Sequence, residues 1–360
     1  MTEAGSLTSA LQALVEKAIA RAEGWLPFDR FMALALYAPG LGYYANDSRK
    51  FGMLPSSGSD FVTAPEMTPL FGATLAVQIA DALRATGTAE VWEFGAGSGA
   101  LALQLLEALH TSVQRYIIVE LSGSLRQRQR ETLAGYGDKV QWVDELPERF
   151  SGVIVGNEVL DAMPVKLLLR KDGRWHERGV GPGLAWIDRE TGLRPPVAIA
   201  GEHDYLTEIH PQAQAFIRTL ADRLERGAAF FIDYGFGEAE YYHPQRHMGT
   251  LMCHRGHLAD TDPLRDVGRK DITAHVDFSG LALAAQEAGL PTLGYTSQAR
   301  FLMNCGLVPR LAEAPLVQRI AGQRLIAEHE MGELFKVIGF HKGDFWDACG
   351  FSQGDRVDRL

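Results

Sequence analysis

The sequence contains little cysteine and no long apolar run. Its 360 residues include only three cysteines, Cys253, Cys305 and Cys349, and no two of them form a CxxC pair. This sparse, odd count argues against a disulfide framework and is typical of a reducing compartment. No apolar run approaches the roughly 18 residues of a membrane-spanning helix, and residues 1–20 lack a signal-peptide pattern. We therefore expect a cytoplasmic protein with no membrane span.

The chain has fewer basic than acidic residues. The chain has 35 lysines and arginines against 45 aspartates and glutamates, a net charge of −10 at pH 7. Binding to a nucleic-acid backbone depends on clustered Lys and Arg, so we expect no nucleic-acid partner. A basic peptide or protein substrate suits this charge balance better.

Several chemical motifs are absent as well. The sequence has no Walker A motif and no GxSxG elbow, which disfavours P-loop and α/β-hydrolase chemistry. A metal could be suggested only by Cys253, His254, His257, Asp260 and His275. Because their spacing matches no standard zinc pattern, we expect no metal site.

Strand and helix patterns alternate from residue 90 onward. Strands are expected at 90–94, 116–120, 140–143, 152–156 and 228–233, with helices at 101–110, 125–133 and 211–225. Strands separated by helices predict right-handed βαβ units and a parallel, Rossmann-like α/β sheet.

The flanking segments have weaker patterns. Helices are expected at 7–21, 28–36, 69–85, 279–288 and 299–330, and late strands at 290–296 and 334–340. Residues 165–187 indicate a β excursion with a hairpin turn at Lys171-Asp172-Gly173. Residues 235–270 resemble a loop.

The most informative stretch is a glycine-dense turn between a strand and a helix. Residues 91–99 read VWEFGAGSG, and glycine lets the backbone approach a ligand closely. Gly95, Gly97 and Ala100 fit a dinucleotide fingerprint. Glu93 followed by Gly95, Gly97 and Gly99 fits the S-adenosylmethionine form, in which the carboxylate lies near the ammonium of the amino-acid moiety. A carboxylate there would repel a pyrophosphate, so charge favours S-adenosylmethionine.

Two further carboxylates follow the next strands. Glu120 ends the second strand, where it can accept hydrogen bonds from both ribose hydroxyls, and this fits either cofactor class. Asp144 follows the third strand and is a candidate for binding the adenine amino group.

Polar residues after the fourth strand form the candidate catalytic segment. Asn157, Glu158 and Asp161 lie in NEVLDA, beyond the carboxyl end of that strand, where open α/β sheets place their sites. Carboxylates could pair with a guanidinium, which is planar and has five donors. The same residues could instead cap a helix, form a surface ion pair or make a turn. Asp233-Tyr234-Gly235, after the fifth strand, could shape the same pocket.

Seven segments together resemble one family, the MidA-type methyltransferases. They are YAPGLGYY (37–44), DFVTAPE (60–66), PLFG (69–72), EFGAGSG (93–99), VELS (119–122), NEVLDA (157–162) and DITAHVDF (271–278). The family includes the mitochondrial protein arginine methyltransferase needed for assembly of respiratory complex I. Members often read Gly-Asp-Phe where this chain has Ser59-Asp60-Phe61, which affects the local backbone rather than the class.

The resemblance implies the fold and the remaining cofactor contacts. It implies a class I methyltransferase sheet with an N-terminal helical cap and inserted segments. It implies S-adenosylmethionine as cofactor, with Thr63, Pro65, Glu66 and Leu121 among the residues that contact it. The expected division is a cap with a cofactor-covering loop at 1–85, a core at 86–235 with a β insertion near 165–200, an inserted substrate region at 236–330 and a final core strand within 331–360.

The resemblance also implies N-methylation of an arginine in a partner protein, which could be a respiratory-complex subunit. Two alternatives remain open. One is an enzyme of another kind, a small-molecule methyltransferase or an NAD-linked oxidoreductase. The other is an assembly or partner-binding protein that keeps a cofactor site mainly for stability. The sequence does not predict the oligomeric state.

Overall fold

A computed structural model describes residues 3–46 and 62–360 of the chain. Its centre is a mixed sheet in the order β15-β16-β10-β5-β2-β3-β4, with β14 also paired to β10. The strands are β2 (Glu90–Phe94), β3 (Arg115–Val119), β4 (Val140–Val143), β5 (Phe150–Asn157), β10 (Leu224–Phe236), β14 (Val276–Asp277), β15 (Thr292–Ser297) and β16 (Phe335–Lys342). The five strands expected from the alternating pattern are all present and mutually parallel, and the predicted α/β fold is confirmed.

The two late strands turn the sheet from parallel to mixed. β16 runs antiparallel to β10, and β15 runs antiparallel to β16. Both strands were expected from their hydrophobicity, but the pattern carried no information about their direction or neighbours.

Alternation along β10 explains why helices cover both faces of the sheet. Phe230 and Ile232 pack into the core on one face, together with helices α4 (Leu70–Thr86) and α5 (Ala100–Leu109). Phe231 faces the other way, into the core formed with α7 (Pro211–Arg223) and α9 (Phe278–Glu287). Successive side chains of a strand point to opposite faces, so one apolar strand supplies both cores.

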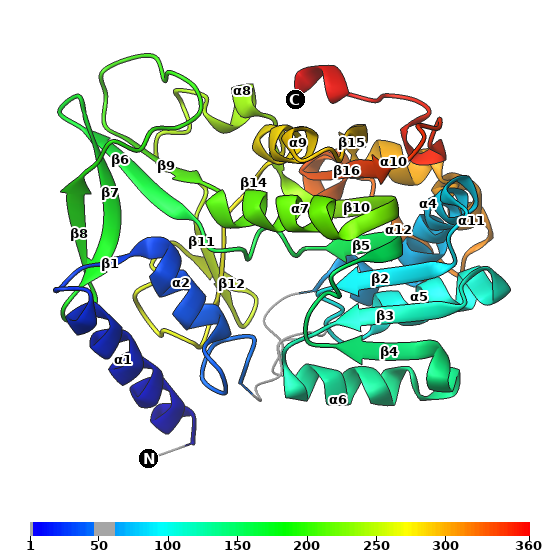
Figure 1. Cartoon of the computed structure of the whole chain (residues 1–360), viewed down its shortest axis with the longest axis horizontal. Coiled ribbons are helices and arrows are strands. Elements are labelled where there is room, and N and C mark those ends of the chain that lie inside the picture. The colour runs from blue at the N-terminus through cyan, green and yellow to red at the C-terminus, as the bar shows by residue number, and fades with distance from the viewer. Residues whose placement is uncertain (1–2, 47–61) are drawn as a thin grey trace.

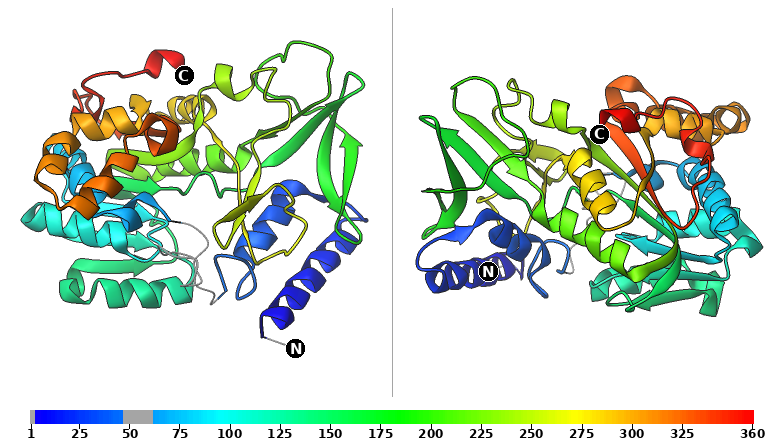
Figure 2. Two further views of the ribbon diagram at one scale, coloured as in Figure 1. Left: turned by 180° about the vertical axis from the view of Figure 1, so that it is seen from behind. Right: turned by 45° about the horizontal axis from the view of Figure 1, so that its top comes forward.

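A second body, which we call the cap, lies beside this core. It contains α1 (Glu3–Arg21), β1 (Leu26–Pro27), α2 (Phe28–Tyr37) and the antiparallel strands β6 (Lys166–Lys171), β7 (Arg174–Gly181), β8 (Ala185–Glu190) and β9 (Tyr205–Ile209). A small sheet of β11 (Met252–Arg255), β12 (Leu258–Asp260) and β13 (Asp271–Thr273) completes it. Figures 1 and 2 show α1 and α2 beside β6–β8 in every view, on the opposite side of the molecule from α5 and α6.

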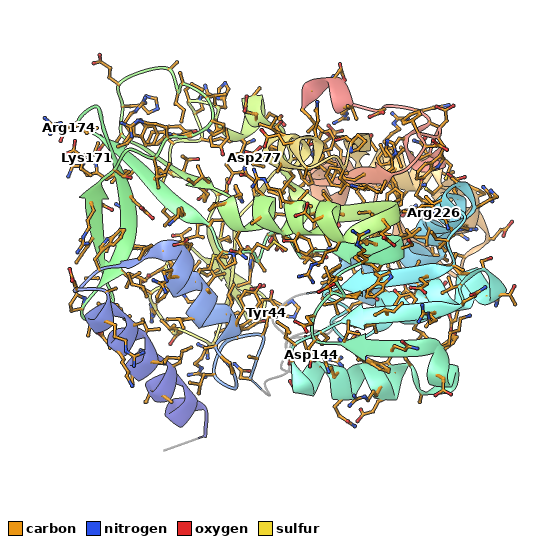
Figure 3. The ribbon with its side chains drawn as sticks, in the orientation of Figure 1. Tyr44, Asp144, Lys171, Arg174, Arg226 and Asp277 are labelled. Atoms are coloured by element: carbon orange, nitrogen blue, oxygen red, sulfur yellow. The ribbon has the colours of Figure 1, made fainter. Side chains whose placement is uncertain are left out.

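One shared hydrophobic core makes the cap a unit. Phe31 of α2, Leu167 of β6 and Ile272 of β13 are buried in the same cluster, although they are far apart in the sequence. The cap is therefore built from helices and sheets rather than from helices alone. At its far end the predicted hairpin turn joins β6 to β7, and Figure 3 shows Lys171 and Arg174 well away from Tyr44.

Several predicted elements differ from the structure. The helix expected at 299–330 is three helices, α10 (Gln298–Asn304), α11 (Leu307–Glu313) and α12 (Leu316–Arg324), because Gly306 is left-handed (φ +86°) and Pro315 precedes α12. The loop expected at 235–270 contains α8 (Glu238–Tyr241), β11 and β12. These strands are too short and polar to show alternation.

The predicted domain division places two elements differently from the structure. Helix α4, assigned to the first segment, packs on the core sheet, and β15, assigned to the inserted region, pairs with β16 inside that sheet. An apolar helical face does not reveal which surface it covers. The boundaries themselves stay a prediction. The segment Ser59-Asp60-Phe61, at which this chain departs from the family pattern, lies outside the described residues. In the described part of the chain, no helix is long and apolar enough to cross a bilayer.

The contact between β15 and the C-terminal segment gives a test of the fold. An added Cβ at Gly294 would lie 2.1 Å from the buried ring of Phe351. We expect Gly294→Ala to lower the free energy of unfolding by about 1–3 kcal/mol through overpacking. Urea denaturation measures this change. Gly135→Ala is the matched control, since no atom lies within 4 Å of its added Cβ; equal stability of the two variants would contradict the packing described.

Candidate active site

A cavity of about 1020 Å³ opens between the core sheet and the cap. It lies at the carboxyl ends of the parallel strands β2, β3, β4 and β5, where α/β sheets place ligands. Of the site residues predicted from the sequence, it is lined by Thr63, Pro65, Glu66, Glu93, Gly95, Gly97, Glu120, Leu121, Asp144, Asn157, Glu158 and Asp161. Gly99 does not line it.

The glycine turn adopts a backbone that other residues rarely take. Gly95, Gly97 and Gly99 have φ angles of +66°, +53° and +86°. A Cβ at Gly95 would lie 2.7 Å from the side chain of Val159, so this glycine is also required for close approach. Gly99 instead caps the start of α5 and faces Thr132 on the neighbouring helix, which is why it lies behind the cavity wall.

Gln129 connects the glycine turn to the carboxylate of Glu120. This fully buried residue of α6 (Gly123–Thr132) donates to the carbonyl of Gly97 and to Oε2 of Glu120, both at 3.1 Å. It also accepts a hydrogen bond from the indole of Trp142 at 3.0 Å. No sequence pattern distinguishes Gln129, because a glutamine in a polar helix resembles any solvent-exposed residue.

Glu93 is a buried carboxylate at the end of β2. Its side chain is 1% exposed and accepts a 2.6 Å hydrogen bond from the hydroxyl of Tyr116. Burial raises the pKa of Glu93 to about 8, although the bond from Tyr116 opposes the rise. The cavity therefore contains a carboxylate whose charge lacks a cationic partner within the described protein, which suits a ligand ammonium.

Glu120 and Asp144 differ in their surroundings. Glu120 accepts from the backbone N–H of Ser122 at 2.8 Å as well as from Gln129, and burial raises its pKa. Asp144 is 76% exposed in its side chain and pairs with Arg126. The neighbouring Leu121 is 78% exposed, so an apolar side chain stands at the mouth of the cavity.

The segment before α4 is tied to the glycine turn. Helix α3 (Ala64–Met67) contains Pro65, whose carbonyl accepts a 2.8 Å hydrogen bond from Gln104 of α5. Glu66 accepts a hydrogen bond from the hydroxyl of Ser98. These contacts hold the segment from Thr63 to Glu66 over the start of α5.

The predicted catalytic residues lie together on the loop after β5. Asn157 donates to Glu158 Oε1 at 2.9 Å, while its own Oδ1 is buried with no hydrogen-bond partner. Glu158 has a φ of +54°, an uncommon conformation for a non-glycine residue that marks a constrained backbone. Burial, and to a lesser extent Asp161, raises the pKa of Glu158 to about 8.

Asp233 shapes this loop from the neighbouring strand β10. Its Oδ2 accepts from the backbone N–H groups of residues 159, 160 and 161 at 3.2, 2.9 and 3.2 Å. Tyr234 then donates to Oδ2 of Asp161, and Oδ1 of Asp161 is buried without a partner. Burial raises the pKa of Asp161 to about 6, against the hydrogen bond from Tyr234. Glu158 and Asp161 are thus neither helix caps nor surface ion pairs.

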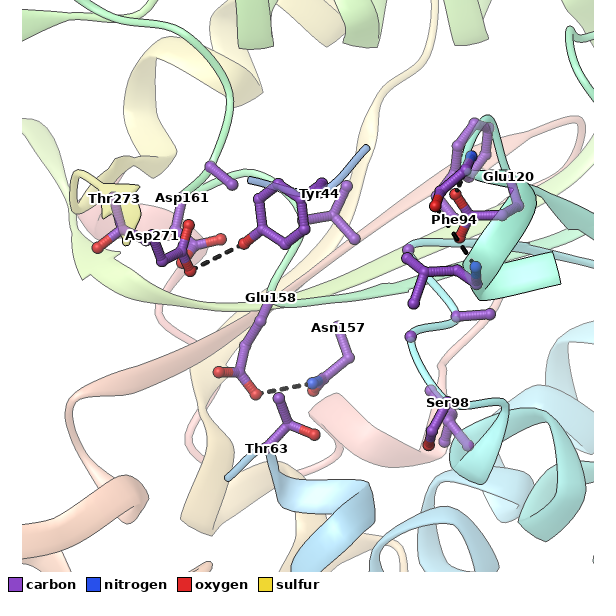
Figure 4. Close-up of a pocket in the computed structure, with 18 of the residues that line it drawn as sticks. Tyr44, Thr63, Phe94, Ser98, Glu120, Asn157, Glu158, Asp161, Asp271 and Thr273 are labelled. Carbon is purple, nitrogen blue, oxygen red and sulfur yellow. Dashed lines mark hydrogen bonds between the residues drawn. The ribbon is translucent and has the colours of Figure 1, made fainter. Parts of the chain in front are cut away.

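The cap supplies the opposite wall of the cavity (Figure 4). Its contributions, which sequence reasoning did not assign to the site, are Tyr37, Pro39, Gly40, Tyr44, Ala45, Thr250, Met252, His254, Asp271, Thr273 and His275. Most of these residues lie in 37–44 and 271–278, two of the seven segments that carry the family resemblance. Membership of those segments is the sequence feature that could have identified them as site residues. Within the described ranges, no three His, Cys, Asp or Glu side chains are grouped so that they could hold a metal ion.

The fold and the site together define a class I methyltransferase. It has a Rossmann-like sheet, a glycine turn after β2 and acidic residues at the ends of β2 and β3, which are the features that the sequence predicted for a cofactor site. The buried, unpartnered Oδ1 of Asn157, which is part of the cavity lining, fits a ligand that brings a hydrogen-bond donor to this point.

Comparisons with known proteins assign the family. Residues 74–296 match the family model of S-adenosyl-L-methionine-dependent methyltransferases, and the chain belongs to this MidA-like family. It is therefore an enzyme that uses S-adenosylmethionine. The resemblance described from the sequence is confirmed, and the oxidoreductase alternative is not supported.

Individual relatives agree with this assignment. A crystal structure from Burkholderia thailandensis, bound to S-adenosyl-homocysteine, is 49% identical with a TM-score of 0.93, and covers 100% of this chain and 99% of that one. The curated relatives include "Protein arginine methyltransferase NDUFAF7 homolog, mitochondrial" from Caenorhabditis elegans, 27% identical over 81% of this chain and 75% of that protein. The human "Protein arginine methyltransferase NDUFAF7, mitochondrial" is 28% identical over 81% of this chain and 72% of that protein.

The contacts of Gln129 give a test of the cofactor side. Gln129→Met keeps the volume but leaves Gly97 O and Glu120 Oε2 without their donor, so we expect S-adenosylmethionine affinity to fall at least about tenfold. Isothermal titration measures the affinity, and thermal unfolding confirms the fold. Gln127→Met is the control, because Gln127 is exposed on the same helix. Unchanged affinity in a folded Gln129→Met protein would show that cofactor binding does not depend on the hydrogen bonds of Gln129.

Proposed function

We propose that the enzyme transfers the methyl group of S-adenosylmethionine to a guanidinium nitrogen of an arginine in a partner protein. The observation that supports this most is the charge of the cavity. Its described lining includes the carboxylates of Glu66, Glu93, Glu120, Asp144, Glu158, Asp161 and Asp271, and no lysine or arginine. Burial lowers the pKa of His275 to about 4, so this lining residue adds no positive charge near neutral pH. Such a cavity favours a cationic guest.

The acceptor side would work mainly by orientation. Glu158 and Asp161 would pair with two edges of the guanidinium and draw its positive charge away from the attacking nitrogen. Asp233 and Tyr234 would keep Asp161 in place through the hydrogen bonds described above. When bound, S-adenosylmethionine supplies the methyl group as an electrophile. Glu158, with its raised pKa, is suited to take the proton that the methylated nitrogen gives up.

The cofactor side follows from the remaining predicted residues. Glu93 would bind the ammonium of the methionine moiety, and Glu120 would accept from the ribose hydroxyls. Asp144 and Leu121 would border the adenine. Thr63, Pro65 and Glu66 would cover the bound cofactor, while Gly95, Gly97 and Gly99 give its turn the required backbone. Asn157 would use its unpartnered Oδ1 toward the same ligand.

The names of the relatives support the substrate class. Those quoted above are protein arginine methyltransferases and are mitochondrial. A protein substrate, which could be a respiratory-complex subunit, and a cytoplasmic location for this chain stay predictions. A small cationic metabolite as acceptor and a mainly partner-binding role are the alternatives that the experiments below distinguish.

Replacing the acceptor carboxylates tests the reaction. We expect Glu158→Gln and Asp161→Asn each to slow methyl transfer to peptides with a single arginine by about 10–100-fold, since each loses a charged hydrogen bond. Affinity for S-adenosylmethionine should stay within about threefold, because the contacts at Glu93 and Glu120 remain. Mass spectrometry of the peptides measures the transfer, and Glu190→Gln on the exposed face of β8 is the control.

Three results would contradict the proposal. The same peptides are also tested with lysine in place of the arginine, and small amines are tested beside them. Transfer only to the lysine peptides, or only to the small amines, would exclude arginine as the acceptor. A Glu158→Gln protein that binds cofactor, cannot transfer methyl groups and still supports the cellular function would favour the partner-binding role.

The raised pKa of Glu158 predicts a pH dependence. A guanidinium binds the ionised carboxylate, whose fraction grows as pH rises toward a pKa of about 8. In the complex with S-adenosyl-homocysteine, affinity for a single-arginine peptide should therefore rise between pH 6.5 and 8, by up to about tenfold per unit, with proton release. Titration calorimetry in two buffers of different ionisation enthalpy measures both. Glu158→Gln should flatten the rise above pH 7, and a flat profile in the unmodified protein would refute the assignment.

A further inference from the structure

Asp271 is a buried carboxylate of the cap that lines the cavity between cap and core. It begins β13 and is 3% exposed. Its Oδ2 accepts a 2.8 Å hydrogen bond from the hydroxyl of Tyr44, whose ring stacks on Tyr37 with centroids 5.6 Å apart. Figure 4 shows Tyr44 pointing toward Asp271, with Asp161 and Thr273 on the same side of the cavity. The carboxylate is therefore oriented by the cap's own residues.

Asp271 is electrostatically part of the acceptor cluster. Besides burial, the negative charges of Asp271 and Asp161 both raise the pKa of Tyr37 and of Tyr44. Asp271 also raises the pKa of Glu158. All three carboxylates line the same cavity, and these effects agree with that placement. The three carboxylates come from two different parts of the molecule. Glu158 and Asp161 follow β5 of the core, and Asp271 begins β13 of the cap.

A guanidinium and an ammonium use such a space differently. A guanidinium carries five N–H donors in a plane and can be held along more than one edge, whereas an ammonium is a compact point charge. We propose that Asp271 is the third carboxylate of the acceptor site and that, together with Glu158 and Asp161, it selects a planar guanidinium over a primary ammonium. This inference rests on the proposed function, and it assigns the selection to a residue of the cap.

A set of three cofactor analogues tests it without a protein substrate. In each, the sulfur of S-adenosyl-homocysteine is replaced by a nitrogen that carries a three-carbon chain, which ends in a guanidine, a urea or a primary amine. Dissociation constants are measured by isothermal titration at pH 8 on the full chain. The urea compound has nearly the shape of the guanidine compound but no charge, and a carbonyl oxygen takes the place of one NH2 group of the guanidinium. The ratio of their dissociation constants therefore reports recognition of the charged, donor-rich guanidinium.

Asp271→Asn should lower the preference for guanidine over urea by about tenfold, with a smaller effect on the amine compound. Affinity for S-adenosyl-homocysteine should not change. Asp266→Asn is the matched control. Asp266 lies between β12 and β13 and pairs with Arg255. Its φ of +55° is one that Asn adopts readily, so the substitution should not strain the backbone. It should leave all three constants unchanged.

The failures of the two proposals are distinguishable. No preference for guanidine over urea in the unmodified protein would overturn the proposed function. A normal preference that survives Asp271→Asn would overturn the role of Asp271 alone. Equal losses for the guanidine and amine compounds would show that Asp271 acts only as a charge and would overturn the selectivity. If Asp271→Asn does not fold, Tyr44→Phe decides: it removes the bond that orients the carboxylate, and an unchanged preference would overturn the inference.

Discussion

The carboxylate of Asp233 organises the loop on which the rest of the site depends. Its Oδ2 collects three successive backbone N–H groups, and Oδ1 accepts the N–H of Tyr234 at 2.9 Å. This closes the chain after β5 into a tight turn and holds Glu158 at its uncommon positive φ. The same turn presents two carbonyls to the cap: Asp161 O accepts from the backbone of Ala274 at 2.9 Å, and Ala162 O from Tyr37 at 2.8 Å. One buried carboxylate thus positions the acceptor residues and the junction between core and cap.

The electrostatics of the cavity follow from what that turn buries. Glu93, Glu158 and Asp161 are enclosed among neutral groups and other carboxylates, and burial raises all three pKa values. A raised pKa means that the folded state binds more protons than the unfolded state, so these groups weaken the empty protein as pH rises through their titration. The ligands of a methyltransferase acting on arginine bring positive charge to the same places, as an ammonium and a guanidinium. Under the proposed function, the buried carboxylates lower the stability of the empty enzyme and raise its affinity for cationic ligands, a common relation between stability and function.

Local patterns in the sequence were sufficient for the parts of this site that come from single segments. Runs such as 152–156 are apolar on both faces because the strand is buried on both, and the glycines at 95, 97 and 99 have positive φ as a tight turn requires. Residues whose role comes from distant partners could not be found this way. Gln129 matters because Gly97 and Glu120 lie beside it, and Asp271 because Tyr44 and the loop after β5 do. Likewise β16 was visible as a strand, but its antiparallel place beside β10 is a long-range choice that hydrophobicity does not encode.

The division of labour between core and cap follows from how each is stabilised. The core places the glycine turn, Glu93 and Glu120 on elements that are contiguous from residue 90 to 132, so the positions of these residues are set by one stretch of chain. The cap gathers α1–α2, β6–β9 and β11–β13 into one hydrophobic cluster, and its cavity wall depends on that packing. Tyr37 crosses between the two, since it bonds to the core carbonyl of Ala162 while it stacks on Tyr44 of the cap. A change in cap packing should therefore reach Tyr44 and Asp271 before it disturbs Glu93 and Glu120, so under the proposed function the cap acts on the acceptor side rather than on the cofactor side.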